Sequence, residues 1–334
     1  SLDANLASNN TAVGSSALGA NTTGATNTAV GLESLAANTT SSSNVAIGYN
    51  SLATNTTGSN NVAVGANAAA ASTGVGNTAL GESALAAANT ANYNTAVGNS
   101  ALASNTSGGS NVALGRNALN ANTTGSVNTA VGMRALDVNT TGSNNTALGG
   151  DSMGANTTGA SNTAVGMDSL KANTTGTNNT AVGSLALNAN TTANNNTSVG
   201  VSSLQSNTTG SENQAFGTFA LTQNSTGSSN TAVGYNTLGA ATTADSNTAM
   251  GLRALQANTT ASDNTAVGSR ALTANTTGAQ NVAIGGDAAT SHTTGDYNIF
   301  LGRSCGSNGN VATTGSKNTL LGSYANLSAS TGAT

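Results

Sequence analysis

Residues 162–178 read NTAVGMDSLKANTTGTN, and the same pattern begins again at Asn179. The block Asn-(Thr/Val)-Ala-(Val/Ile/Leu)-Gly recurs nineteen times with small variations, from Asn10 to Asn318. Its spacing is seventeen residues, except for one gap of sixteen after Asn61 and one of twenty after Asn298. Such a short fixed period indicates a solenoid, in which each repeat is one rung.

Seventeen residues are too few for a pair of helices but enough for one coil of two short strands and their turns. The sequence therefore predicts an all-β chain, a parallel β-solenoid of about nineteen rungs. Stacked about 4.8 Å apart, these rungs would form a rod of roughly 90 Å. Residues 1–9 are expected to be an N-terminal lead-in and residues 10–297 the regular repeats. Residues 298–334, with bulkier core positions and a stretched period, are expected to be irregular C-terminal rungs that form a cap or a junction.

Composition excludes several classes of protein. Only 5% of the residues are charged, 2% are aromatic, and the chain has no Pro. Disordered chains are usually rich in charge and Pro, so an ordered chain is expected. The net charge of −4 is spread thinly, which argues against nucleic-acid binding. No apolar run is long enough to span a bilayer, so membrane insertion is not expected.

Residues 163–165 are expected to form the first strand of their rung, with Thr163 and Val165 on one face and Ala164 on the other. Both faces are therefore nearly apolar, whereas a strand with one wet face would alternate with polar residues. We expect one face to pack in the core of the rung and the Ala face to meet another subunit. The predicted core residues are Val165, Leu170 and Leu136, and the predicted interface residues are Ala29, Ala46 and Ala164.

Asn and Gly recur at fixed places in the rung, so identical residues should lie above one another. Stacked Asn side chains can hydrogen-bond from rung to rung, and a constant Gly indicates a positive φ or a close backbone approach. The expected ladder residues are Asn27, Asn44, Asn162, Asn173, Gly31, Gly48 and Gly166. The Asn-Thr-Thr triplets also match the glycosylation acceptor pattern, which is the weaker interpretation.

The two positions after each Gly vary freely and should face water. They carry most of the charge and include Tyr49, Tyr235 and Phe219, which are candidate exposed contacts.

Catalytic chemistry is not expected. One His and one Cys give no metal cluster and no Cys–His pair, and no rung carries two acids together. His292 is expected to be a surface turn residue, and Cys305 either an inert buried thiol or an interchain link. Asp151 and Asp168 would lie on neighbouring rungs, either holding a cation or forming a solvated charge ladder with Arg134. Arg270 and Asp287 are expected to pair in the same way.

The blocks Asn44-Val-Ala-Ile-Gly48 and Asn281-Val-Ala-Ile-Gly285 resemble the head repeats of trimeric autotransporter adhesins, Asn-x-x-Ala-Ile-Gly. Similar repeats occur in phage tail-fibre-like proteins and in large bacterial surface proteins. The resemblance covers roughly residues 10–302. It implies a left-handed β-roll, three chains side by side and a role in attachment. The rungs here are longer than those of the adhesins, because an Asn-Thr-Thr-Gly turn is added.

These observations together favour a non-enzymatic subunit of an extracellular, cell-surface or virion fibre that acts as a rigid shaft or attachment module. Its expected partners are other copies of itself, in a homotrimer or a filament, and a cell-surface receptor or glycan. No cofactor or metal is expected. The alternatives are an ice-binding β-solenoid, suggested by the many Thr residues, and an end-to-end self-assembling filament.

Overall fold

The computed structural model describes residues 9–307 and 314–326, and its regular secondary structure there consists of three-residue β-strands, one in each repeat. Their bounds are β1 Thr11–Val13, β2 Thr28–Val30, β3 Val45–Ile47, β4 Val62–Val64, β5 Thr78–Leu80, β6 Thr95–Val97, β7 Val112–Leu114, β8 Thr129–Val131, β9 Thr146–Leu148, β10 Thr163–Val165, β11 Thr180–Val182, β12 Thr197–Val199, β13 Gln214–Phe216, β14 Thr231–Val233, β15 Thr248–Met250, β16 Thr265–Val267, β17 Val282–Ile284, β18 Ile299–Leu301 and β19 Thr319–Leu321.

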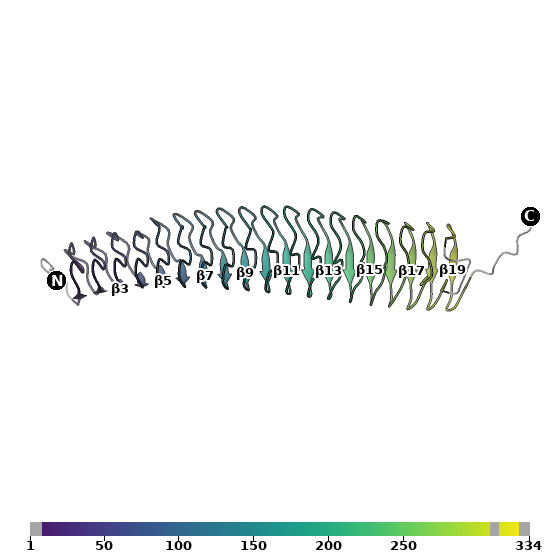
Figure 1. Ribbon diagram of the computed structural model, residues 1–334, viewed down its shortest axis with the longest axis horizontal. Coiled ribbons are helices and arrows are strands. Elements are labelled where there is room, and N and C mark those ends of the chain that lie inside the picture. The colour runs from purple at the N-terminus through teal and green to yellow at the C-terminus, as the bar shows by residue number, and fades with distance from the viewer. Residues whose placement is uncertain (1–8, 308–313, 327–334) are drawn as a thin grey trace, which may run out of the picture. The chain divides into compact units, whose positions relative to one another are not determined.

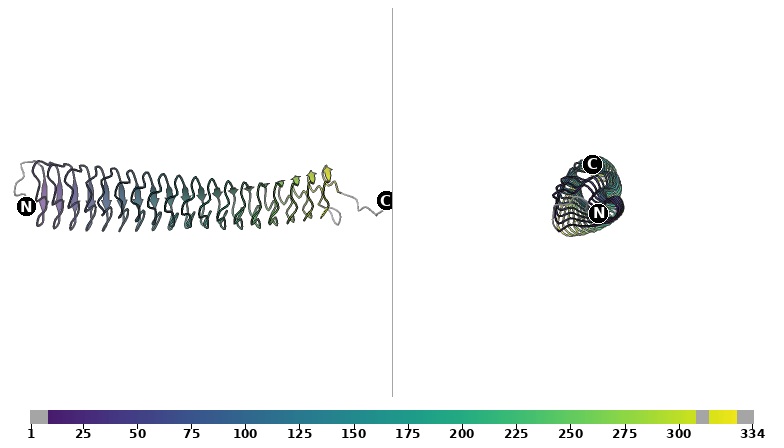
Figure 2. Two further views of the ribbon diagram at one scale, coloured as in Figure 1. Left: turned by 90° about the horizontal axis from the view of Figure 1, so that it is seen from above. Right: turned by 90° about the vertical axis from the view of Figure 1, so that its left-hand side faces the viewer.

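The chain divides into two compact units. Unit 1 comprises Ser1–Asp168 with Asn173–Thr175 and contains β1–β10, and unit 2 comprises Ser169–Ala172 with Gly176–Thr334 and contains β11–β19. Within each unit, neighbouring strands pair in parallel and in register one repeat apart, as when Ala46 lies opposite Ala63 and Ala266 opposite Ala283. In each unit the strands stand in one row and the turns in others (Figures 1 and 2). The parallel β-solenoid predicted from the repeat is confirmed.

The second strand predicted in each rung is absent from the described residues, where turns take its place. In these turns alternate residues adopt the left-handed conformation, with φ of 54° at Ser100 and 53° at Leu102. Their amides still bond to adjacent rungs: Ser100 N–H donates to Glu82 O (3.0 Å) and Leu102 N–H to Ala118 O (2.9 Å). Because the sign of φ alternates, the backbone of this segment bends and cannot be an extended strand. Its amides nevertheless form hydrogen bonds to the neighbouring rungs.

The core of each rung lies between the Ala of the strand and the Leu of the following turn. Leu136 and Leu170 are fully buried, as predicted. The interface predicted at Ala29, Ala46 and Ala164 is wrong, because these side chains are already 0% exposed in the single chain. Val165 is also not a core residue: it points outward and is partly exposed, with Thr163 on the same face. The coil is narrow, so its inner wall accepts the methyl group of Ala opposite Leu, and the larger side chains of the strand are turned outward.

Two buried columns of Asn support the coil, as predicted. In the first, which precedes each strand, Asn44 N–H donates to Asn27 Oδ1 (3.0 Å), and Asn27 Nδ2 donates to Ser41 O (2.9 Å). In the second, in the Asn-Thr-Thr turn, Asn173 Nδ2 donates to Asn156 Oδ1 (2.8 Å). Asn162, in the first column, donates from its backbone N–H to Asn145 Oδ1 (3.0 Å). These amides satisfy polar groups that water cannot reach.

The Gly that follows each strand has a φ near 130°, with 132° at Gly31, 128° at Gly48 and 129° at Gly166. A Cβ added at Gly31 would lie 2.5 Å from the carbonyl oxygen of Gly48, so the close approach of neighbouring rungs also requires Gly. The structural role predicted for this Gly column is confirmed.

The pattern of core residues changes at the C-terminal end of unit 2. Phe300 and Leu320 occupy the strand position that holds Ala or, in β12, Ser198 in the other rungs, and both are buried. The Leu position of the turn is taken by Ala289 and then by Gly306, where an added Cβ would lie 2.5 Å from Phe300 Cδ1. In these rungs the large side chain of the core therefore comes from the strand, and the small one from the turn. The predicted lead-in and the rest of the predicted cap fall largely on residues 1–8, 308–313 and 327–334, which are outside the described residues.

Candidate functional site

The outer face of each strand carries an apolar column. The third residue of every strand is aliphatic or aromatic or Met, and it stays partly exposed, as at Ile47 (39%), Leu114 (38%) and Ile284 (40%). The first strand residue, usually Thr or Val, lies on the same face, and from β2 to β12 it is partly exposed. Single exposed apolar residues are ordinary on a protein surface, but a contiguous row within one unit indicates a surface that binds something.

The two positions that follow each Gly form a second outward surface, which we call the variable corner. Tyr49 (51%), Tyr235 (46%) and Phe219 (39%) are exposed there, as predicted. Phe219 and Tyr235 also contact each other, with ring centroids 6.0 Å apart and an interplanar angle of 79°. Tyr49 lies in unit 1, so the structure brings together two of the three predicted contacts within one unit.

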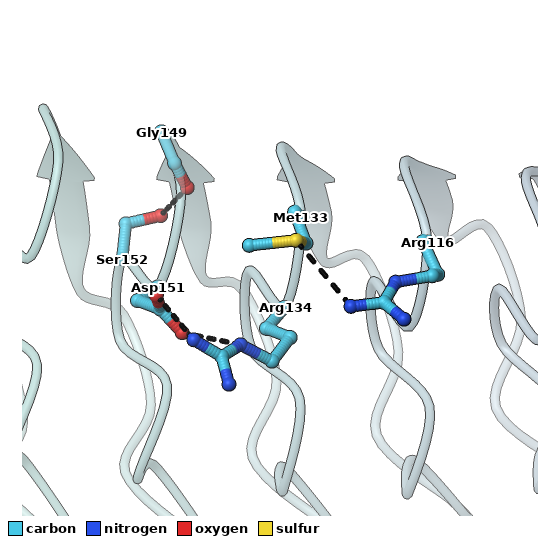
Figure 3. Close-up of polar contacts among 6 residues, drawn as sticks. All are labelled: Arg116, Met133, Arg134, Gly149, Asp151 and Ser152. Atoms are coloured by element: carbon cyan, nitrogen blue, oxygen red, sulfur yellow. Dashed lines mark hydrogen bonds and ion pairs between the residues drawn. The ribbon is translucent and has the colours of Figure 1, made fainter.

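Charged side chains on the variable corner pair along the stack. Arg134 binds Asp151 of the next rung through two hydrogen bonds of 2.8 Å (Figure 3). Arg270 and Asp287 pair in the same way at 2.6 Å, as predicted. The Arg134–Asp151 pair supports the charge ladder over the cation site. The hydrogen bond to Asp151 raises the pKa of Arg134, and burial raises the pKa of the nearby Asp137 carboxyl.

Met133 also lies on this corner, where Arg116 Nη2 contacts its sulfur at 3.6 Å (Figure 3). The variable corner of unit 1 therefore presents Arg116 on one rung, Met133 and Arg134 on the next, and Asp151 on the rung after that.

The exposed position predicted for His292 is wrong. His292 is fully buried in the turn Asn column, where its Nε2 lies 2.8 Å from Gly295 O and its ring 5.4 Å from that of Phe300. His292 therefore stands at the position where most other rungs have the buried Asn of the turn. Cys305 is fully buried as well, and burial raises the pKa of its thiol, which favours the inert thiol over the interchain link.

The His, Cys, Asp and Glu side chains of the described residues, which are the types that could bind a metal, do not form a cluster. Among the described residues, no three His, Cys, Asp or Glu side chains are close enough to hold a metal ion. Unit 2 has a shallow groove of about 400 Å³, lined by Arg270, Thr273, Asp287, Thr290, Ser304 and Ser307. Its lining offers hydroxyl groups and one ion pair, which suit binding rather than proton transfer.

A third outward column consists of the second Thr of the Asn-Thr-Thr turn. In unit 1 the first Thr is tied to the next rung, as when Thr140 Oγ1 donates to Thr157 O (3.0 Å), whereas the second Thr is exposed. The exposed members include Thr124, Thr141 and Thr158 in unit 1 and Thr192, Thr209, Thr226, Thr243, Thr260, Thr277 and Thr294 in unit 2. Alternation predicts that only one Thr of each pair faces water. This is wrong at Thr22–Thr23 and Thr56–Thr57, where both residues are exposed.

In the part of the chain that the structure describes, no helix is long and apolar enough to cross a membrane. No protein-family model matches the chain, and no curated protein is significantly similar to it.

Proposed function

We propose that the chain is a non-catalytic structural subunit of an extracellular, cell-surface or virion fibre, and that it serves as a rigid shaft or attachment module. The observation that carries this proposal is the apolar column on the outer face of the strands. The core of the coil does not need this outer column for its own stability. A second chain with the same repeat, lying alongside, would match the column rung by rung.

The partner that we propose is another copy of the same chain, bound through the outer strand face and not through the Ala face. In unit 1 the third strand residue stays partly or fully exposed on every one of the ten strands, so this face is continuous along the unit. The resemblance to adhesin head repeats favours a homotrimer of left-handed coils over an open filament.

The mass of the full chain in solution, measured by light scattering, tests this proposal. We expect a species of three times 31.8 kDa, whereas a broad distribution of much larger species would favour the filament. A triple substitution of Leu114→Thr, Val131→Thr and Leu148→Thr should weaken association and leave the circular dichroism unchanged, because Thr suits strands. The matched control is Met133→Thr with Met167→Thr, which removes exposed apolar side chains from the variable corner. A wild-type chain that stays monomeric at micromolar concentration would contradict the proposal.

Ice binding is a second candidate, favoured by one specific observation. The strand Thr column, which sequence reasoning assigned to the interior, lies on the outer face instead, as Thr129, Thr146 and Thr163 show in unit 1. These hydroxyl groups repeat at about the 4.8 Å spacing of stacked strands. Inhibition of ice recrystallisation by the monomer, lost on substitution of these three residues by Lys, would favour this candidate over the fibre.

A further inference from the structure

Unit 2 carries apolar and aromatic side chains on three successive rungs of its variable corner. Phe219 (39%), Tyr235 (46%) and Leu252 (48%) come from three successive rungs and are all exposed. The rungs are joined at this corner, since Phe219 N–H donates to Val201 O and Arg253 N–H donates to Tyr235 O. The rings of Phe219 and Tyr235 pack edge to face, an arrangement that aromatic pairs favour, and both side chains stay exposed.

Arg253 lies next to this cluster and is exposed. Among the described residues, its guanidinium has no carboxylate partner, whereas Arg270 on the next rung is paired with Asp287. A free guanidinium is a geometric match for a carboxylate, which it binds through two parallel hydrogen bonds.

The shallow groove described above begins one rung beyond Arg253. It is lined by the Arg270–Asp287 pair and by the hydroxyl-bearing residues Thr273, Thr290, Ser304 and Ser307. Aromatic rings, an unpaired guanidinium and a hydroxyl-lined groove therefore follow one another along the axis of unit 2. From Phe219 to Ser304 they extend over five rung steps, or about 24 Å at 4.8 Å for each step.

We propose that this strip binds an acidic oligosaccharide that lies along the rungs. The aromatic rings would pack on the apolar C–H face of a sugar ring, Arg253 would bind a carboxylate of the glycan, and the groove would bind the sugar hydroxyls. The area favours a glycan over a protein: the three apolar side chains expose roughly 300 Å², well below the roughly 800 Å² that a protein partner needs. This assignment rests on the proposed attachment role, for which it supplies the ligand class.

Saturation-transfer NMR on the full chain tests the proposal with two acidic probes, sialyllactose and a galacturonic acid trisaccharide, and with lactose as the neutral comparison. We expect at least one acidic probe to bind with a Kd on the order of 1 mM, and lactose to bind about tenfold more weakly or not at all. The Arg253→Gln variant should lose about tenfold in affinity for the acidic probe, the effect of removing a charge-assisted hydrogen bond. The Phe219→Ser, Tyr235→Ser double variant should lose binding to both kinds of sugar.

The Tyr49→Ser variant is the matched control, because Tyr49 is as exposed as Tyr235 but lies in unit 1. It should bind as the wild type does. Equal affinity for lactose and the acidic probes, or wild-type affinity in Arg253→Gln, would overturn the proposal. Absence of binding to both acidic probes would also overturn it. Light scattering on the same samples separates this result from the fibre proposal, because assembly through the strand face does not depend on these residues.

Discussion

Removal of one amide from the inside of the turn ladder should destabilise the coil by several kcal/mol. Asn156 is fully buried, and its Nδ2 donates to Asn139 Oδ1 (2.8 Å) and to Gly159 O (3.0 Å). Its own Oδ1 accepts a hydrogen bond from Asn173 Nδ2 (2.8 Å). The Asn156→Ala substitution therefore removes three hydrogen bonds. It leaves the buried Asn139 Oδ1 without this donor, whereas Gly159 O still accepts from Asn145 Nδ2 (2.9 Å). With about 1–3 kcal/mol for the deprived oxygen and about 0.5–1.5 kcal/mol for each of the other two hydrogen bonds, the expected loss is about 2–6 kcal/mol.

Chemical denaturation of the variant, followed by circular dichroism, gives the size of this loss, and hydrogen exchange gives its location. Because a rung contacts mainly its neighbours, amide protection should fall around Asn156 and stay unchanged several rungs away. The matched control is Thr158→Ala, two residues along the same turn, where the side chain is exposed. An Asn156→Ala variant within about 0.5 kcal/mol of this control, a typical range for surface substitutions, would refute the idea that the ladder stabilises the coil.

Three further outcomes follow from the structure. Gly285→Ala should destabilise unit 2, because the φ there is 134° and an added Cβ would lie 2.5 Å from the next rung, whereas Gly286→Ala, with nothing within 4 Å, should be nearly neutral in the same thermal melt. Phe300→Ala should cost about 3–5 kcal/mol through the cavity it leaves, and a second substitution of Gly306→Leu should restore part of that loss by returning bulk to the turn; denaturation of both variants checks this. Burial raises the pKa of Asp137, so its proton is held more tightly in the folded chain and its contribution to stability falls as pH rises above the ordinary value of 3.8. Asp137→Asn should therefore gain stability relative to the wild type between acidic and neutral pH in parallel urea titrations.

The period of the sequence was enough to predict the rungs, their parallel register and both Asn columns. Identical residues spaced by one repeat must lie above one another in a solenoid, so Asn27 and Asn44 had to be neighbours once the period was accepted. The Gly column follows from the same reasoning, since a residue that is constant in every rung marks a backbone constraint. Handedness and the number of chains do not follow from the period.

The inner and outer faces of the strand could not be told apart by polarity, because Thr, Ala and Val differ little in this respect. Size variation carries the missing signal. The middle strand position is almost always Ala, whereas the third position ranges from Val199 to Phe216 and Met250. A confined site does not tolerate such changes in volume, so the constant position is the buried one. The exception supports this reasoning: Ser198 replaces Ala by nearly equal volume, and its hydroxyl donates to Ser203 O (2.8 Å).

The left-handed turn residues were also missed, for a different reason. Leu is rarely found at positive φ, and each such residue costs about 1–2 kcal/mol. The sequence therefore predicted a second short strand in each rung, where the structure has turns with Leu170 and its equivalents at positive φ. In the coil this local cost is offset by burial of the whole Leu side chain and by the hydrogen bond from Leu170 N–H to Ala186 O (2.9 Å). The preference of a single residue is therefore overridden by interactions that exist only when rungs are stacked.

Stability and recognition are carried by different columns of the same repeat. The Ala, Leu, Asn and Gly columns meet only the chain itself, and a change in any one of them disturbs the rungs on either side. The strand face and the variable corner point outward. The second position of the corner accepts residues as different as Arg134, Phe219 and Asp287 at nearly the same φ, 56°, 59° and 58°. Substitutions on these outer columns can therefore change what a rung binds at little cost to folding. For this reason association and ligand binding can each be abolished in a chain that remains folded, which makes both proposals separable by experiment.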